Sequence, residues 1–151
     1  MTLFKEVDRP QPVTIDRVER VLTHNNLDYT RREDGITATV DGFFLRVTIP
    51  NGKALNFDFR FFDMPLPQES LPEAQRWAQE RNLDATIGTF CIGVHNDGEV
   101  YASSQHAFLI TQGATDEQLA EFFRVGIEAQ VDNLVDFVEE FGLERPRRRG
   151  K

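Results

Sequence analysis

Hydrophobic positions near the C-terminal end of the chain recur at helical spacing. They follow one another at intervals of three, four or seven residues, which is the spacing of one wide helix face. Thr115 and Gln118 have the spacing of a capping box, and Gly142 suits a left-handed C-cap. We therefore predict one long helix over residues 115–141 that packs on a sheet or on a partner. Its apolar stripe includes Leu119, Phe123, Ile127, Leu134, Phe137 and Phe141.

Earlier in the chain the period of the pattern changes from helical to alternating. Residues 36–40, 43–49 and 55–61 each alternate apolar with polar side chains, and Asp-Gly or Asn-Gly pairs separate them. Such dipeptides favour hairpin turns, so we predict an antiparallel meander. One face is apolar and the other polar, as expected for a sheet covered on one side only. Residues 27–31 are an additional candidate for a short first strand.

Helices and further strands flank the meander. Thr14 suits the N-cap of a first helix, and Ser70 with Glu73 has the spacing of a second capping box. The expected order is α-β-β-β-α-β-β-α, which predicts an α+β fold with an antiparallel sheet of about five strands packed on helices. The elements expected outside the meander are helices at 14–26 and 70–82 and strands at 86–94 and 99–110.

Length and composition fit one globular domain. The chain has 151 residues, of which 40% are hydrophobic, and its 13 phenylalanines suit a core between sheet and helices. The alternative explanation of the high phenylalanine content is an exposed aromatic groove. We divide the chain into a lead-in at 1–12, a single domain at 13–144 and a basic, disordered tail at 145–151.

The charge is unevenly distributed between the domain and the tail. The net charge is −8, and the tail at 145–151 holds five basic residues and no acidic one, so the remainder carries −13. An acidic body repels phosphates, which makes nucleic acid an unlikely partner. The tail remains an alternative contact for nucleic acid or an acidic surface, and we interpret it as a solubilising end.

The sequence also indicates a compartment. Cys91 is the single cysteine, so no intramolecular disulfide can form, which fits a reducing environment. The charged start of the chain does not resemble a signal peptide, and no apolar run approaches the roughly 20 residues of a membrane span. We expect a cytoplasmic protein that does not contact a membrane.

Candidate chemistry is sparse. His24, His95 and His106 do not have metal-ligand spacing, and Cys91 lacks a CxxC partner. The nucleophile elbow, the phosphate-binding loop and the dinucleotide fingerprint are all absent from the sequence. We therefore predict that the protein is not an enzyme and that it has no catalytic residue, metal or cofactor.

Five residues are candidates for binding a partner. Trp77 lies on the second predicted helix beside Arg76 and Arg81, and Trp and Arg are enriched at interface hot spots. The same helix can instead close the rim of the core with Trp77. Phe44 and Phe62 interrupt the polar face of the meander, so a second subunit is expected to cover part of that face.

Several motifs in their order resemble the YbjN family, described as bacterial sensory transduction regulators. The resemblance covers residues 13 to 141 and implies a fold similar to type III secretion chaperones, a homodimer, and binding of other protein segments. It implies no catalytic residue. The motifs are Pro12-Val13-Thr14-Ile15-Asp16-Arg17-Val18, Leu27-Asp28-Tyr29 through Glu33-Asp34-Gly35, Asp97-Gly98, and Gly113-Ala114-Thr115-Asp116-Glu117-Gln118-Leu119.

These observations leave two main hypotheses for the function. The first is a non-enzymatic, cytoplasmic protein-binding module, chaperone-like or a regulatory adaptor, that acts as a homodimer. The alternative is a small-molecule sensor or enzyme with a pocket between the sheet and the C-terminal helix, lined by Phe57, Phe59 and Phe61. A third, weaker hypothesis is regulation of nucleic acid through the basic tail.

Overall fold

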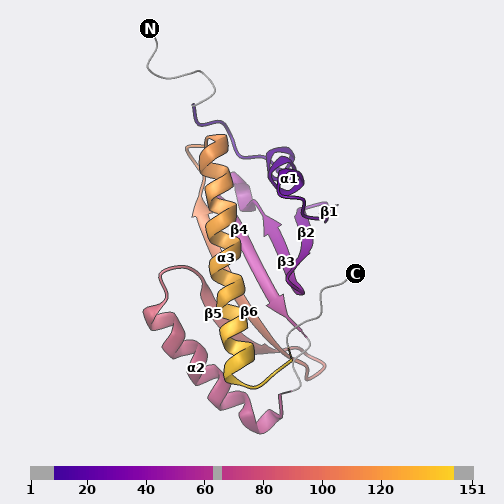
Figure 1. The fold of residues 1–151 in the computed structure, drawn as a ribbon, viewed down its shortest axis with the longest axis vertical. Coiled ribbons are helices and arrows are strands. Elements are labelled where there is room, and N and C mark those ends of the chain that lie inside the picture. The colour runs from indigo at the N-terminus through magenta and orange to yellow at the C-terminus, as the bar shows by residue number, and fades with distance from the viewer. Residues whose placement is uncertain (1–8, 63–65, 145–151) are drawn as a thin grey trace.

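The computed structural model describes residues 9–62 and 66–144 and shows an α+β fold (Figure 1). Helices and strands follow in nearly the order that the sequence predicts. The helices are α1 (Ile15–His24), α2 (Leu71–Asp84) and α3 (Asp116–Glu140), with short 3-10 turns η2 (Pro50–Gly52) and η3 (Gln68–Ser70). The strands are β1 (Tyr29–Arg32), β2 (Gly35–Val40), β3 (Phe43–Thr48), β4 (Ala54–Phe61), β5 (Thr89–Val94) and β6 (Val100–Leu109).

The strands form one antiparallel sheet in the order β1-β2-β3-β4-β6-β5. The first four strands are the predicted meander, and the expected count of about five becomes six because the short candidate strand is present as β1. Strand β6 pairs with both β4 and β5, so the second hairpin joins the meander through its later strand. Residues of the β5–β6 hairpin, which are distant from β4 in sequence, thus lie beside the end of β4.

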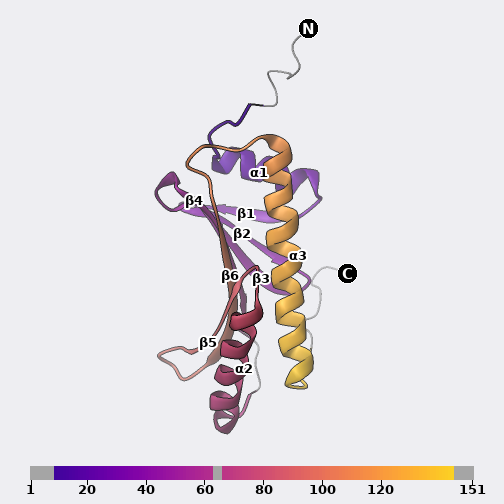
Figure 2. The same cartoon turned by 90° about the vertical axis from the view of Figure 1, so that its left-hand side faces the viewer.

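The helices contact one face of the sheet (Figures 1 and 2). Helix α3 runs along β4 and β6, α1 contacts β2 and α3, and α2 lies against β5. Side chains that face the helices alternate along β2, β3 and β4 and are buried, as the amphipathic pattern predicts. Among residues 9–62 and 66–144, no helix lies on the opposite face of the sheet. We call it the open face.

Helix α3 begins and ends where the sequence predicts. The Thr115 hydroxyl accepts from the Gln118 N–H at 3.0 Å, and the Gln118 side chain accepts from the Thr115 N–H at 2.9 Å, which completes the capping box. Gly142 follows the helix with a φ of +62°. The predicted left-handed C-cap is therefore confirmed.

Phenylalanines fill the space between α3 and the sheet. The Phe57 ring lies edge-on to Phe123 of α3 at 4.9 Å and to Phe108 of β6 at 5.9 Å. Phe59 and Phe61 are buried in the same core. These rings are interleaved with the helix or the neighbouring strands, so they occupy the space that a pocket between sheet and helix requires.

The capping box predicted at Ser70 does not form. Ser70 has helical φ and ψ because it is the last residue of the 3-10 turn η3, and its side chain makes no capping hydrogen bond. Strand β5 begins at Thr89, three residues later than predicted. Gly88 has a φ of +87° and donates its N–H to His106 Nδ1 at 3.1 Å, so the chain turns there before pairing begins.

Candidate functional site

The open face of the sheet combines a polar half with an aromatic half. Its side chains come from every second position of the paired strands, as the register shows. The polar half covers β1 to β3, and the aromatic half lies where β3 begins and β4 ends. Side chains on this face include Thr30, Arg32, Thr37, Thr39, Phe44, Arg46, Asp58, Arg60, Cys91 and Tyr101.

Four rings form an aromatic cluster, which we define as Phe44, Phe62, His95 and Tyr101. Phe44 lies 6.1 Å from Phe62, Phe62 stacks on His95 at 5.8 Å, and His95 lies 4.4 Å from Tyr101. Phe62 is 40% exposed. The cluster joins the end of the meander to the β5–β6 hairpin and leaves apolar ring surface accessible.

Close packing holds Tyr101 of the aromatic cluster. A Cβ placed on Gly93, its neighbour on β5, would lie only 2.5 Å from the tyrosine Cζ, so a larger residue would displace the ring. The Arg60 guanidinium lies 6.0 Å from the centre of the Tyr101 ring and bonds to Asp58. The ring is therefore fixed between a glycine and a cation.

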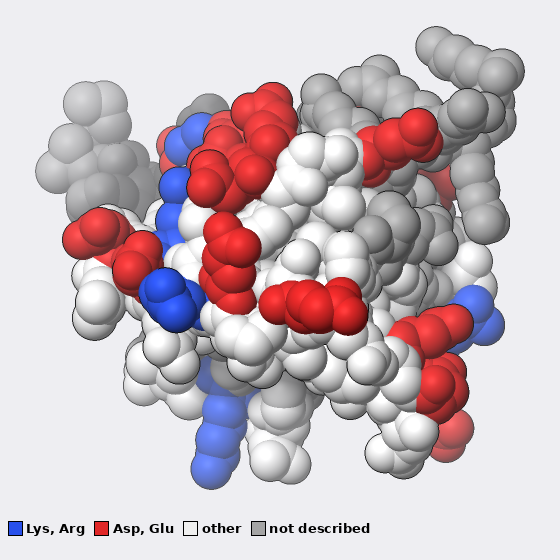
Figure 3. Space-filling view, turned by 90° about the horizontal axis from the view of Figure 1, so that it is seen from below, with Lys and Arg blue, Asp and Glu red and all other residues white. Residues whose placement is uncertain are grey.

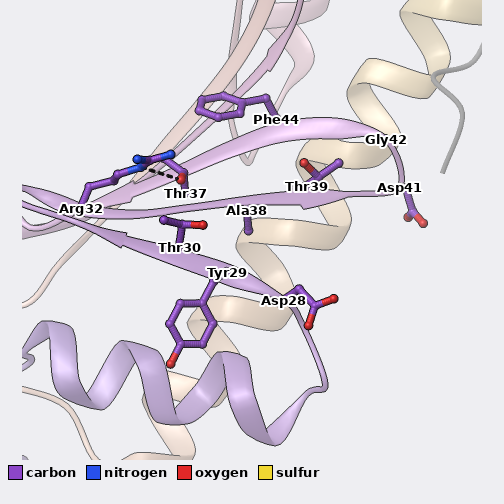
Figure 4. A pocket seen from close by; sticks show the side chains of 10 residues that line it. All are labelled: Asp28, Tyr29, Thr30, Arg32, Thr37, Ala38, Thr39, Asp41, Gly42 and Phe44. Atoms are coloured by element: carbon purple, nitrogen blue, oxygen red, sulfur yellow. Dashed lines mark hydrogen bonds between the residues drawn. The ribbon is translucent and has the colours of Figure 1, made fainter. Parts of the chain in front are cut away.

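A hollow of about 670 Å³ borders the aromatic cluster (Figure 4). Phe44 belongs to both features, because its ring also lines the hollow. In Figure 4 the side chains of Arg32 and Phe44 rise from one side of the strands, whereas Tyr29 points to the opposite side, toward α1. The volume lies within the roughly 300–1,000 Å³ range of ligand sites. Its remaining lining includes Thr30, Thr37, Thr39, Asp28 and Asp41.

Arg32 differs from the other arginines of the open face. Arg46 pairs with Asp34, and Arg60 pairs with Asp58. Arg32 is exposed and donates from Nε to the Thr37 hydroxyl at 3.3 Å, and within residues 9–62 and 66–144 it has no carboxylate partner. A guanidinium without a counter-ion is thus available in the hollow.

The predicted residues of α2 lie elsewhere. Trp77 is half-buried and contacts Phe90, Phe137 and Phe141 edge-on, with centroid distances from 5.2 to 6.3 Å. Arg81 bonds to Asp136 and Asn133 of α3 and lies 5.8 Å from the indole centre, so both side chains join α2 to α3.

The structure therefore separates the five predicted contact residues into two groups. Arg76 is exposed on α2, the helix from which Trp77 and Arg81 contact α3. Phe44 and Phe62 meet on the open face. Sequence reasoning missed Arg32, His95 and Tyr101, although alternation along the strands carries a signal for Arg32 and Tyr101.

Polar side chains near β5 form a second, internal group. His106 lies partly buried beside Gly88, and burial lowers the pKa of its imidazole. Gln130 is fully buried and donates to the Gly126 carbonyl at 2.9 Å. Asn133 donates to the Ile87 carbonyl at 3.4 Å, so Asn133 and His106 hold the loop before β5 against α3 and β6.

Other chemistry is limited on the described surface. Cys91 is exposed on the open face. Within residues 9–62 and 66–144 no three His, Cys, Asp or Glu side chains gather as a metal site. In the same ranges no helix is long and apolar enough to span a bilayer. The basic tail at 145–151 lies outside the described residues.

Comparison with known proteins gives a family and a fold. The model of the YbjN family, described as "Putative bacterial sensory transduction regulator", matches residues 14–140. No curated protein matches the sequence.

The chain is similar to solved structures from E. coli, Methanothermobacter thermautotrophicus and Yersinia pestis. YbjN from E. coli is similar with a TM-score of 0.73 and 14% identity, covering 89% of this chain and 97% of that one. An uncharacterized protein from Methanothermobacter thermautotrophicus has a TM-score of 0.57 and 10% sequence identity, and the match covers 86% of this chain and 100% of that one. The Yersinia pestis type III secretion chaperone SycH was solved in complex with a stable fragment of YscM2. It has a TM-score of 0.47 and 17% sequence identity, and the match covers 82% of this chain and 99% of that one.

Proposed function

The chain belongs to the YbjN family, and from this premise we propose that it is a non-enzymatic protein-binding module that regulates other proteins. The open face is its contact surface, and the aromatic cluster is the apolar centre of that surface. We further propose that the module acts in the cytoplasm, as a homodimer.

The observation that carries the proposal is the one-sided sheet. The three helices of residues 9–62 and 66–144 contact the same face, while the other face retains Phe62 at 40% exposure within the aromatic cluster. Aromatic and arginine side chains are enriched in protein interfaces, and here they lie together as Phe44, Phe62, Tyr101 and Arg60. The bacterial sensory role that describes the family fits a module of this kind.

Packing of the core disfavours the alternative function of a small-molecule sensor or enzyme. That function needs a pocket lined by Phe57, Phe59 and Phe61, and these rings are buried in the core. The open face also lacks a nucleophile hydrogen-bonded to a base among the interactions of the described residues.

The native cysteine provides a direct test of the contact surface. A photo-reactive benzophenone attached to Cys91 places the probe on the open face, and crosslinked peptides are identified by mass spectrometry after irradiation in cell extract. The control combines Cys91→Ser with Leu83→Cys, which moves the thiol to a site on α2 that is 86% exposed. We expect reproducible protein crosslinks from Cys91 only. Equal crosslinking from both positions would contradict the proposal.

The homodimer is tested by sedimentation velocity across protein concentrations. A dimer has twice the 17.3 kDa of one chain. If the open face is the contact between subunits, Phe62→Ser shifts the mass toward the monomer and Arg76→Gln does not. A wild-type mass of one chain at all concentrations would rule out the homodimer and leave the crosslinking result unaffected.

A further inference from the structure

We infer that the open face binds an extended peptide segment that carries an acidic and an apolar side chain two residues apart. The acidic side chain meets Arg32 in the hollow, and the apolar one meets Phe44 and Phe62 of the aromatic cluster. This inference rests on the proposed function, because it names the chemistry of the partner at the same surface.

The free guanidinium of Arg32 argues for a carboxylate in the partner. Within residues 9–62 and 66–144, the other two arginines of the open face already have carboxylate partners, whereas Arg32 bonds only to the Thr37 hydroxyl. That bond uses Nε and leaves the terminal nitrogens of the planar fork available. A guanidinium fork binds a carboxylate through paired, charge-assisted hydrogen bonds.

The strand register gives the spacing between the two contacts. The Arg32 side chain reaches Thr37, which lies two residues from Thr39, and Thr39 is directly opposite Phe44 on β3. Two residues along a strand span about 7 Å and adjacent strands are about 5 Å apart, so the diagonal from Thr37 to Phe44 is roughly 9 Å. Alternate side chains of an extended peptide lie on one face about 7 Å apart, which is within about 2 Å of this diagonal.

Charges around the hollow set the orientation of the peptide. Asp28 and Asp41 line the end of the hollow away from Arg32, near the start of β1 and the end of β2 (Figure 4). The Asp28 carboxylate repels a second carboxylate at that end, so a peptide carboxylate is favoured at the Arg32 end. Between the ends, the hydroxyls of Thr30, Thr37 and Thr39 can bond to polar groups of the peptide main chain.

The charge of the remaining molecule disfavours a nucleic acid as the occupant. Without the tail at 145–151 the chain carries −13, from a total of −8 and five basic tail residues. A short peptide with one carboxylate contacts Arg32 locally, whereas a polyphosphate strand would pass over acidic surface as well.

A titration followed by NMR tests the spacing and the charge together. Isotope-labelled protein is titrated with Gly-Ser-Asp-Ser-Phe-Ser-Gly. The matched controls are Gly-Ser-Lys-Ser-Phe-Ser-Gly, which reverses the charge, and Gly-Ser-Asp-Phe-Ser-Ser-Gly, which places the two side chains on opposite faces. We expect shifts at Thr37, Thr39 and Phe44, and a Kd about tenfold lower for the first peptide than for either control.

Variants assign the effect to residues. Arg32→Gln should remove the preference for aspartate over lysine, and Phe44→Ser should weaken binding of both aspartate and lysine peptides. Arg76→Gln removes an exposed arginine from α2 and should change nothing. Circular dichroism confirms that each variant is folded before titration.

Three results would overturn the inference. One is equal affinity for the three peptides, and another is unchanged preference in Arg32→Gln. The third is Arg32-dependent binding of oligo-dT, or an Arg32-dependent dimer that excludes the peptide, because either result assigns the surface to a different occupant. None of them alters the Cys91 crosslinking result, so failure of the inference and of the proposed function can be distinguished.

Discussion

Arg17 shows how one side chain can join segments distant in sequence. It is buried in α1 and donates to the carbonyls of Gln11 at 2.7 Å, Pro12 at 3.0 Å and Ala114 at 2.8 Å, and it pairs with Asp116 at 3.0 Å. These contacts fix the segment before α1 against the start of α3. The charge is well solvated by protein groups, although it is removed from water.

We predict that Arg17→Met destabilises the protein by at least about 3 kcal/mol. Methionine keeps the apolar stem but removes every donor, and a hydrogen bond to a charged group contributes about 1.5–3 kcal/mol, so two of the four lost contacts already account for this figure. The control is Arg20→Met, which alters an exposed arginine of the same helix. Urea unfolding measures both variants. Equal stability of wild type and Arg17→Met would contradict the assigned contacts.

His106 gives a prediction about pH. Its Nδ1 accepts the Gly88 N–H, and burial lowers its pKa below the ordinary 6.5. The unfolded chain therefore takes up this proton at higher pH than the native protein. The contribution to stability is complete above about pH 6.5 and is lost as the pH falls toward the lowered native pKa.

We expect His106→Asn to reduce the dependence of the free energy of unfolding on pH between 7.5 and 5. Asparagine offers an uncharged acceptor oxygen near the position of Nδ1 and does not titrate. His24→Asn, at the exposed end of α1, is the control because its ring lies far from Gly88 in the fold. Identical pH profiles for wild type and His106→Asn would show that His106 does not contribute.

At the scale of elements, two capping sequences with the same spacing behave differently. Thr115 bonds to the Gln118 N–H, whereas Ser70 makes no capping bond. We predict that Thr115→Ala costs about 1 kcal/mol and that Ser70→Ala changes stability by less than about 0.5 kcal/mol. Thermal and urea unfolding of the two variants measure the difference. A loss at Ser70 as large as that at Thr115 would contradict the observed geometry.

The sequence predicts those elements whose signals are local. Alternation and Asp-Gly turns identify the meander, and α3 follows from its periodic stripe and caps because these features depend on neighbours in the chain. The failed cap at Ser70 depends on the 3-10 turn that includes it, and the late start of β5 depends on His106, which is distant in sequence. Tertiary contacts decide such positions, and local spacing does not report them.

The candidate site was predicted only in part for the same reason. Alternation along the strands places Phe44 on the polar face. It places Phe62 on the same face, because Phe62 lies two residues after Arg60. Their union with His95 and Tyr101 needs the pairing of β6 with β4, which no local pattern specifies. Among the described residues Arg32 lacks a carboxylate partner, and this likewise depends on which carboxylates lie close in space.

At the scale of the whole molecule, acidic charge dominates the surface. Figure 3 shows Asp and Glu side chains outnumbering Lys and Arg on the end where α2 and the end of α3 lie. Helix α3 alone carries eight acidic residues and one arginine, as its sequence DEQLAEFFRVGIEAQVDNLVDFVEE shows. Like charges at this density repel one another and reduce stability at low salt.

We therefore predict that salt stabilises the protein, and that it stabilises a variant lacking residues 145–151 more strongly. Deletion changes the net charge from −8 to −13 because the segment contributes five positive charges. Raising the salt shortens the Debye length from about 30 Å at 0.01 M to about 10 Å at 0.1 M, which screens repulsion between distant carboxylates. Thermal unfolding at both salt concentrations measures the effect, with sucrose as an uncharged control for solute exclusion. An equal salt response of the two chains would show that the basic segment does not offset the acidic body, and that its charges act apart from the domain.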